Sequence, residues 1–182
     1  KYGTEDNLVL TASTSKITIA GGGISFLGAS GKNLEHFRKR LAVMCIGPNK
    51  LNQQRHLLFL KNIEAVRSHM QKHAEILRPK FEMVQKHLES GLAGKAMGNW
   101  CKPEGGYFVS FDANPGLAKE IIRLSGEAGV KLTPAGATFP YGQDPEDANI
   151  RLAPTFPSVD DLDQAMQVFV TCVQLAAVRQ RM

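Results

Sequence analysis

The stretch "LTASTSKITIAGGGISF", residues 10–26, places a single lysine, Lys16, between small hydroxyl residues and three consecutive glycines. Lysines usually lie on solvated faces among other charged residues. This one follows an apolar run, "NLVLTA" at residues 7–12, that predicts a β-strand. The glycines allow the backbone to approach another group closely. The stretch therefore predicts a strand, a lysine turn and a Gly-rich connection up to residue 30.

Composition limits the function classes. The chain has 182 residues, of which 43% are hydrophobic and 21% charged, as is ordinary for a globular protein. No apolar run approaches the ~20 residues of a membrane span. Cys45, Cys101 and Cys172 are odd in number and widely spaced, so we expect reduced cysteines and a cytoplasmic location. The charge of +5 is spread out, and its densest cluster, residues 32–40, predicts a solvated helix face rather than a nucleic-acid patch.

Helical and strand patterns alternate along the chain, which predicts an α/β fold. The long helix has apolar residues at steps of three, four or seven, with Pro79 as a kink, and a coiled-coil arm is its alternative. Ser158 is expected to cap the last helix, with Asp161 in the capping-box place. The expected helices cover residues 32–45, 62–92, 116–130 and 157–182, and the expected strands of the second half cover residues 105–114, 130–136 and 149–154.

Two phosphate-binding motifs are excluded by the order of residues around Lys16. A P-loop places its glycines before a Lys-Ser or Lys-Thr pair that opens a helix, whereas here the glycines follow the lysine. The segment "GGGISFLG" at residues 21–28 lacks the strand, helix and acidic residue of a dinucleotide fingerprint.

A Schiff-base lysine explains the neighbours of Lys16 better. An amine that condenses with an aldehyde needs close access, which small neighbours allow, and a disfavoured positive charge, which burial at an apolar strand end would provide. The hydroxyls of Ser13, Thr14 and Ser15, with glycine N–H groups, could bind a phosphate nearby. The alternative is that a Ser-Lys turn before glycines is ordinary loop chemistry.

Arg151, in "NIRLAP" at residues 149–154, is the second candidate site residue. Alternation along a strand sends Ile150 and Leu152 to one face and Arg151 to the other. A guanidinium between apolar neighbours needs a partner, because an unpaired buried charge is costly, and its fork binds a carboxylate bidentately. The partner is either a ligand or an Asp or Glu in a structural salt bridge, and the residues alone leave both open.

The order of these motifs is similar to that of a known enzyme family. The motif "SxSK" with its Gly-rich turn, a long helix, "GGYFVSF" and "NIRLAP" together resemble the C-terminal half of fold-type I pyridoxal-phosphate-dependent aminotransferases. More narrowly, "TSKITIAGGG", "GPNKLNQQRH" and "LTPAGATFPYG" resemble a bacterial aspartate aminotransferase-like subgroup. The resemblance covers nearly the whole chain.

The resemblance implies a cofactor and roles for four residues. It implies that pyridoxal 5′-phosphate is held by Lys16 as a Schiff base, that Ser13 and Ser15 lie near its phosphate, and that Arg151 binds the substrate α-carboxylate. It also implies amino acid and 2-oxo acid substrates, an aspartate-like amino donor and a homodimer. Most relatives have an arginine for the phosphate eight residues after the lysine, where this chain has Ile24.

The same resemblance implies the domain organisation. Residues 1–57 would end the large cofactor-binding domain, residues 58–92 would form the interdomain helix, and residues 93–182 would form the small domain. Since such enzymes carry the ring-stacking aromatic and the acid for the ring nitrogen upstream of the lysine, we expect a piece of a longer enzyme. By itself the chain is expected to be inactive, with its first 60 or so residues packed less completely than the rest.

Two other function classes remain open. An aminotransferase-like effector domain of a transcription regulator would bind the cofactor without turnover. A helical interaction module would leave Lys16 and Arg151 without a role.

Five further residues have two interpretations each. His69 and His73 stand four apart on the long helix, as a metal pair would, but without a third ligand we expect a solvated helix face and no metal. Tyr107 is either a substrate contact or a core aromatic. Lys50 and Arg55 either bind a second carboxylate across a dimer interface or are surface charges.

Overall fold

A computed structural model describes residues 3–182, and the chain divides into two units, Lys1–His73 and Ala74–Met182. The first unit contains the 3-10 helix η1 (Glu5–Asn7), the strands β1 (Val9–Ser13) and β2 (Ser25–Ala29), and the helices α1 (Gly31–Met44) and α2 (Lys50–Leu60). Helix α3 (Ile63–Leu92) starts in the first unit and continues into the second. The second unit adds β3 (Gly98–Trp100), β4 (Val109–Ala113), α4 (Ala118–Glu127), the 3-10 helix η2 (Pro140–Gly142), β5 (Asn149–Leu152) and α5 (Val159–Arg181).

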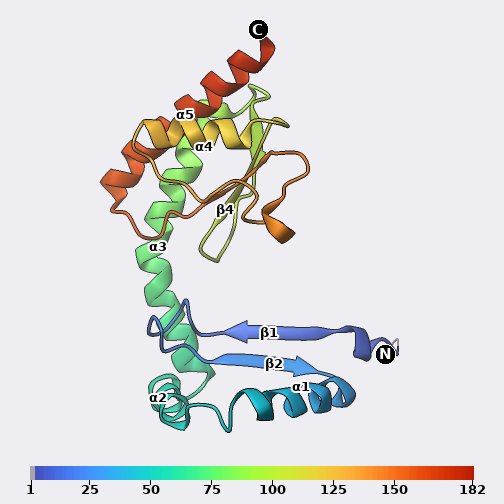
Figure 1. The fold of residues 1–182 in the computed structure, drawn as a ribbon. Helices are drawn as coiled ribbons and strands as arrows, with labels where there is room; N and C mark the ends of the chain where they lie inside the picture. Colours follow the sequence, from blue (N-terminus) through green and yellow to red (C-terminus); the bar gives the residue numbers. More distant parts are fainter. Residues whose placement is uncertain (1–2) are drawn as a thin grey trace. The chain divides into compact units, whose positions relative to one another are not determined.

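In the first unit, β1 and β2 form an antiparallel pair, drawn as the two blue arrows of Figure 1. The register places Val9 opposite Ala29 and Ser13 opposite Ser25. The connection between the strands, residues 14–24, carries Lys16. Four of the five residues of β2 and all five of β1 are exposed, so this pair of strands buries almost nothing within the unit.

The second unit is built on an antiparallel sheet in the order β3-β4-β5. Alternate residues of β4 are buried, and they pack against α3, α4 and α5. The Phe111 ring meets the Phe169 ring edge-on at 5.2 Å between centroids, and both side chains are almost fully buried. This apolar cluster is the main source of stability, since the hydrophobic effect grows with the apolar area removed from water. It has these buried members: Val84, Leu88, Leu92, Val109, Phe111, Ala113, Leu117, Ala118, Ile121, Ile150, Leu152, Leu162, Met166, Phe169, Val170, Cys172, Val173, Ala176 and Ala177.

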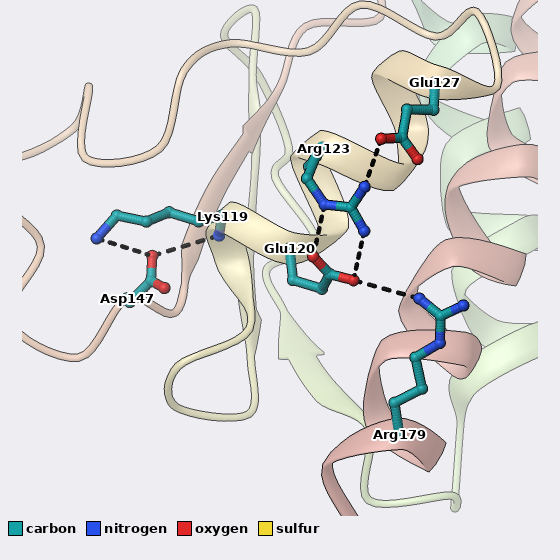
Figure 2. Close-up of polar contacts among 6 residues, drawn as sticks. All are labelled: Lys119, Glu120, Arg123, Glu127, Asp147 and Arg179. Atoms are coloured by element: carbon teal, nitrogen blue, oxygen red, sulfur yellow. Dashed lines mark hydrogen bonds and ion pairs between the residues drawn. The ribbon is translucent and has the colours of Figure 1, made fainter.

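Charged side chains join α4 to α5 on the surface of this unit. Figure 2 shows the Glu120 carboxylate between two guanidiniums, with Arg123 Nε 2.8 Å and Arg179 Nη1 3.4 Å away. The bond from Arg123 is the main reason that the pKa of Glu120 lies below its usual range. Near the start of α4, the Asp147 carboxylate accepts a hydrogen bond from the Lys119 backbone N–H. Exposed pairs of this kind stabilise a fold weakly compared with a core.

The helices were largely predictable. The helices expected over residues 32–45 and 62–92 are α1 and α3, and Pro79 lies inside α3. Ser158 caps α5 by accepting from the Asp161 N–H at 3.1 Å, as expected. Helix α2 and the short strands β2 and β3 were not predicted.

The strand expected over residues 130–136 is wrong, because this segment forms no ladder. Pro134 has no N–H to donate to one. Gly136 has φ +79°, and a Cβ there would lie 2.1 Å from the Gly142 carbonyl oxygen. The segment therefore closes a loop against residue 142, which only glycine permits at this position.

The two units differ in how completely they are packed. Among the described residues, every buried hydrophobic side chain lies in the second unit, whereas the first unit buries only Thr14 and His56. This confirms the expectation that the first 60 or so residues are packed less completely. None of the described helices is long and apolar enough to cross a membrane.

Candidate active site

Lys16 lies in a tight turn directly after β1. The N–H groups of Ile17 and Thr18 both donate to the Thr14 carbonyl at 3.0 Å, so the turn closes around Lys16. The lysine residue is exposed. The expectation that it would be buried at an apolar strand end is therefore wrong for this chain, because β1 itself is exposed on both faces.

Ser13 and Ser15 lie together beside this turn. Their hydroxyl oxygens are 2.6 Å apart, and the Ser15 N–H also donates to the Ser13 hydroxyl at 3.0 Å. One hydroxyl must donate the hydrogen of their mutual bond, so the other keeps its hydrogen for a different acceptor. Both residues are exposed, and an anion placed beside them would meet that O–H donor.

The Thr14 hydroxyl bonds to other residues of the protein and is not accessible to a ligand. Its side chain is 7% exposed, accepts from the Ile24 N–H at 2.8 Å, and lies 3.0 Å from His56 Nε2. Of the three hydroxyls expected near a phosphate, only those of Ser13 and Ser15 are therefore accessible.

Gly23 explains part of the glycine run. A Cβ at this position would lie 2.4 Å from the Ser15 hydroxyl and 2.8 Å from the Ser15 Cα. Gly23 therefore lets the end of the loop pack directly against Ser15, the residue before Lys16. A larger residue at position 23 would push these two parts of the loop apart.

Arg151 lies on β5 in the second unit, opposite Ser110 of β4. Ile150 and Leu152 are buried beside it while Arg151 is half-buried, as the alternation predicted. Its guanidinium carbon is 4.6 Å from the centre of the Phe108 ring. This cation–π contact packs the guanidinium against the Phe108 ring.

Among the described residues, Arg151 does not form the structural salt bridge that was considered for it. No carboxylate of residues 3–182 lies within ion-pair distance of its guanidinium, and the buried Nε has no hydrogen-bond acceptor in this part of the chain. A buried donor left unsatisfied is costly. The guanidinium therefore lacks a carboxylate partner among residues 3–182.

The histidine pair on α3 is not a solvated face, so that expectation is wrong. His69 and His73 are half-buried, and His69 Nε2 donates to the Ile17 carbonyl and lies 3.2 Å from His73 Nε2. Within residues 3–182, no group of three His, Cys, Asp or Glu side chains is arranged to hold a metal ion.

Three further candidate residues were considered for substrate or carboxylate binding. Lys50 is exposed at the start of α2, and Tyr107 is half-buried just before β4. Arg55 lines an open, mainly apolar cavity of about 510 Å³ beside Thr18 and His69. Their proposed roles stay predictions.

Pyridoxal phosphate needs an amine for its aldehyde and donors for its phosphate. The first unit brings together the amine of Lys16, an exposed residue, and a spare hydroxyl hydrogen on Ser13 or Ser15, so these residues fit the cofactor. Arg151, whose fork fits a carboxylate, belongs to the other unit.

Comparison with known proteins shows the family to which the chain belongs. The family model described as aspartate amino-transferase matches residues 1–182. The chain belongs to this family. An aspartate aminotransferase of Corynebacterium glutamicum is 47% identical over 165 residues, which are 91% of this chain and 38% of that protein. A protein of Mycolicibacterium smegmatis, named provisionally as an aminotransferase, is 48% identical over 175 residues, 96% of this chain and 41% of its own.

Solved structures of the family show the same fold. The aspartate transaminase of C. glutamicum superimposes with a TM-score of 0.89 at 45% identity, over 94% of this chain and 41% of that one. The α-aminoadipate aminotransferase of Thermus thermophilus shares the fold at only 19% identity, with a TM-score of 0.77 over 93% of this chain and 42% of its own. This confirms the predicted α/β fold of fold-type I transferases. The chain spans about two fifths of the relatives that it matches, which agrees with a C-terminal part of that fold.

Sequence reasoning missed the residues that hold the lysine loop. His56 and Asn52, one turn apart on α2, bond to the loop through the Thr14 and Thr18 hydroxyls and the Gly22 carbonyl. Nothing in the sequence indicated these contacts, because they join residues about 30 to 42 positions apart through a helix that was not predicted.

Proposed function

We propose that the protein containing this chain is a pyridoxal-phosphate-dependent aminotransferase that transfers an amino group from an amino acid to a 2-oxo acid. The observation that carries this proposal is the exposed Lys16 turn with the two adjoining serine hydroxyls, in a chain of the aspartate aminotransferase family. When bound, the cofactor supplies an aldehyde carbon and an electron sink.

Each site residue has a definite task in this proposal. Lys16 Nζ would hold the cofactor through its aldehyde carbon. When free, the Lys16 amine would take the proton from the substrate Cα as a base and deliver it as an acid to the cofactor carbon instead of returning it to Cα. Of Ser13 and Ser15, the hydroxyl that keeps its hydrogen would donate to the phosphate. Arg151 binds the α-carboxylate and so orients the substrate.

The amino donor in this proposal is aspartate or a similar dicarboxylic amino acid. Its support is the name of the C. glutamicum relative, which is an aspartate aminotransferase 47% identical to this chain. We retain the division into a cofactor domain end (1–57), an interdomain helix (58–92) and a small domain (93–182) as part of the proposal, together with a homodimer.

The test is chemical labelling. Pyridoxal phosphate is added to the protein containing this chain, the adduct is reduced with borohydride, and the tagged peptide is mapped by mass spectrometry. We expect the tag on Lys16, and we expect Lys16→Ala to lose both the tag and transamination. Lys39→Ala, which removes an exposed lysine on α1, should change neither.

Two results would contradict the proposal. A tag on another lysine would remove Lys16 from its role. A tag on Lys16 without turnover of any amino acid would indicate an effector-binding domain instead of an enzyme.

A further inference from the structure

The residues on both sides of Lys16 meet the same imidazole nitrogen. His56 Nε2 lies 3.0 Å from the Thr14 hydroxyl and 3.0 Å from the Thr18 hydroxyl. These threonines stand two residues before and two residues after Lys16. The His56 side chain comes from α2 and is 8% exposed, so a polar ring is buried at this point for contact with the lysine turn.

The hydrogen-bond partners define the state of the ring. His56 Nδ1 is 2.9 Å from the Asn52 carbonyl, which can only accept, so Nδ1 carries a hydrogen. In the neutral ring Nε2 is then an acceptor. The Thr14 hydroxyl accepts from the Ile24 N–H and can donate to Nε2. The Thr18 hydroxyl has one hydrogen and two acceptors at 3.0 Å, the Thr14 carbonyl and His56 Nε2, so it donates to one of them at a time.

Two further bonds hold the same loop from the helices. The Asn52 side-chain NH2 donates to the Gly22 carbonyl at 2.7 Å. His69 Nε2, from α3, donates to the Ile17 carbonyl. The backbone is therefore held one residue after Lys16 and again near the end of the loop, while Lys16 itself is exposed.

We propose that His56 is the positioning residue of Lys16. This inference rests on the proposed function, in which Lys16 Nζ is the reacting amine. A lysine amine sits on a long flexible side chain, so its reach is defined only if its backbone is fixed. Misplacement of a reacting group by about 1 Å can slow a reaction by about a hundredfold. Because His56 Nε2 contacts the hydroxyls of both Thr14 and Thr18, it restrains the backbone before and after Lys16.

The test compares His56→Phe with His36→Phe in the protein containing this chain. Phenylalanine keeps the ring and removes both nitrogens. His36 is an exposed histidine on α1, whose ring contacts Arg40, and serves as the matched control. Two quantities are measured: the rate of borohydride-trapped pyridoxal phosphate labelling at Lys16 relative to Lys39, and, without cofactor, hydrogen exchange of the Thr18 and Ile24 amides.

We expect His56→Phe to slow labelling at Lys16 by at least about fivefold and to speed exchange at both amides by a similar factor, since a buried hydrogen-bond cluster is lost. His36→Phe should change neither by more than about twofold. Unchanged labelling at Lys16 overturns the inference, even if exchange increases, because His56 is then structural only. A wild-type protein without label on Lys16 contradicts the proposed function instead.

A second pair of variants covers the case in which His56→Phe does not fold. Thr18 is half-buried, and its hydroxyl reaches both His56 and the Thr14 carbonyl. Thr18→Val removes this hydroxyl at nearly constant volume, whereas Thr18→Ser retains it. We expect slow labelling of Lys16 for the valine variant and recovery to near the wild-type rate for the serine variant. Equal rates for the two variants would overturn the inference.

Discussion

His87 donates a hydrogen bond from Nε2 to the Asp163 carboxylate over 2.8 Å, and this bond joins α3 to α5 within the second unit. The His87 side chain is largely buried, and Gln167 donates to the other carboxylate oxygen. The bond from His87 is the main reason that the pKa of Asp163 lies below its ordinary value of 3.8.

This contact predicts a pH-dependent stability. Because the folded-state pKa of Asp163 is lowered, its contribution is fully present above the ordinary pKa of 3.8 and is lost as the pH falls through the lower folded value. Asp163→Asn should therefore unfold more easily than wild type at neutral pH, and the difference should disappear in acid below the folded pKa. Denaturant unfolding at a series of pH values measures this, with Glu82→Gln, an exposed carboxylate on α3, as control. A difference that is independent of pH would contradict it.

The burial of Phe111 predicts that the apolar cluster provides most of the stability of the second unit. Its side chain is fully buried against Phe169, so Phe111→Ala should lower the free energy of unfolding of the second unit by about 3–5 kcal/mol. Phe156 is 97% exposed, and Phe156→Ala should change it by less than about 0.5 kcal/mol. Urea unfolding followed by circular dichroism distinguishes the two. Equal effects would show that the apolar cluster is not the source of stability.

The fold was predictable where burial is periodic. Helix α3 and strand β4 alternate between buried and exposed residues at their proper periods, and both were found from the sequence. Strand β2 (Ser25–Ala29) was missed because three glycines precede it and Gly28 interrupts it, a pattern typical of a connection and not of a strand. A strand was wrongly expected over residues 130–136, where Leu132 packs against the apolar cluster from a loop.

The candidate site was predictable only in part, for a related reason. Lys16 and Arg151 stand out because their neighbours are unusual for a charged residue. His56 has ordinary neighbours on α2, and its role depends on Thr14, 42 residues earlier. A contact between residues so far apart in the sequence depends on the fold of the whole unit, so no local sequence pattern indicates it. The close contact between Gly23 and Ser15 could not be predicted from the sequence for the same reason.

Arg151 predicts a defect in substrate binding. Arg151→Lys keeps the charge but loses the planar fork, and hydrogen bonds to charged groups contribute about 1.5–3 kcal/mol. We expect kcat/KM for the amino acid to fall at least about tenfold, while the binding of pyridoxal phosphate stays near normal. Arg123→Lys, in the surface network of Figure 2, should leave both values close to wild type. Loss of cofactor binding in Arg151→Lys would place this residue at the phosphate or in the fold.

Gly23 predicts a sensitive position in the lysine loop. A Cβ there would overlap the backbone of Ser15, so Gly23→Ala must displace the residue beside Lys16. We expect labelling of Lys16 by pyridoxal phosphate and borohydride to slow by at least about tenfold, since a small displacement of a reacting group is costly. In Gly22→Ala the new Cβ would lie 3.5 Å from Ile19, an ordinary contact, so labelling should change little. Similar rates for the two variants would contradict this account of the loop.

The last prediction concerns this 182-residue chain in isolation. Over residues 3–73, its first unit buries no hydrophobic side chain, exposes both faces of β1, and leaves apolar side chains such as Val43 (89% exposed) and Met44 (81% exposed) in water. Such a unit should open locally far more often than the second unit, so Lys16 would not be held in one place. We therefore expect negligible transamination with any common amino acid, and faster amide hydrogen exchange in the first unit than around Phe111. Turnover by the isolated chain above about 1 s⁻¹, the low end for complete enzymes, would show that the Lys16 turn is already competent as it stands.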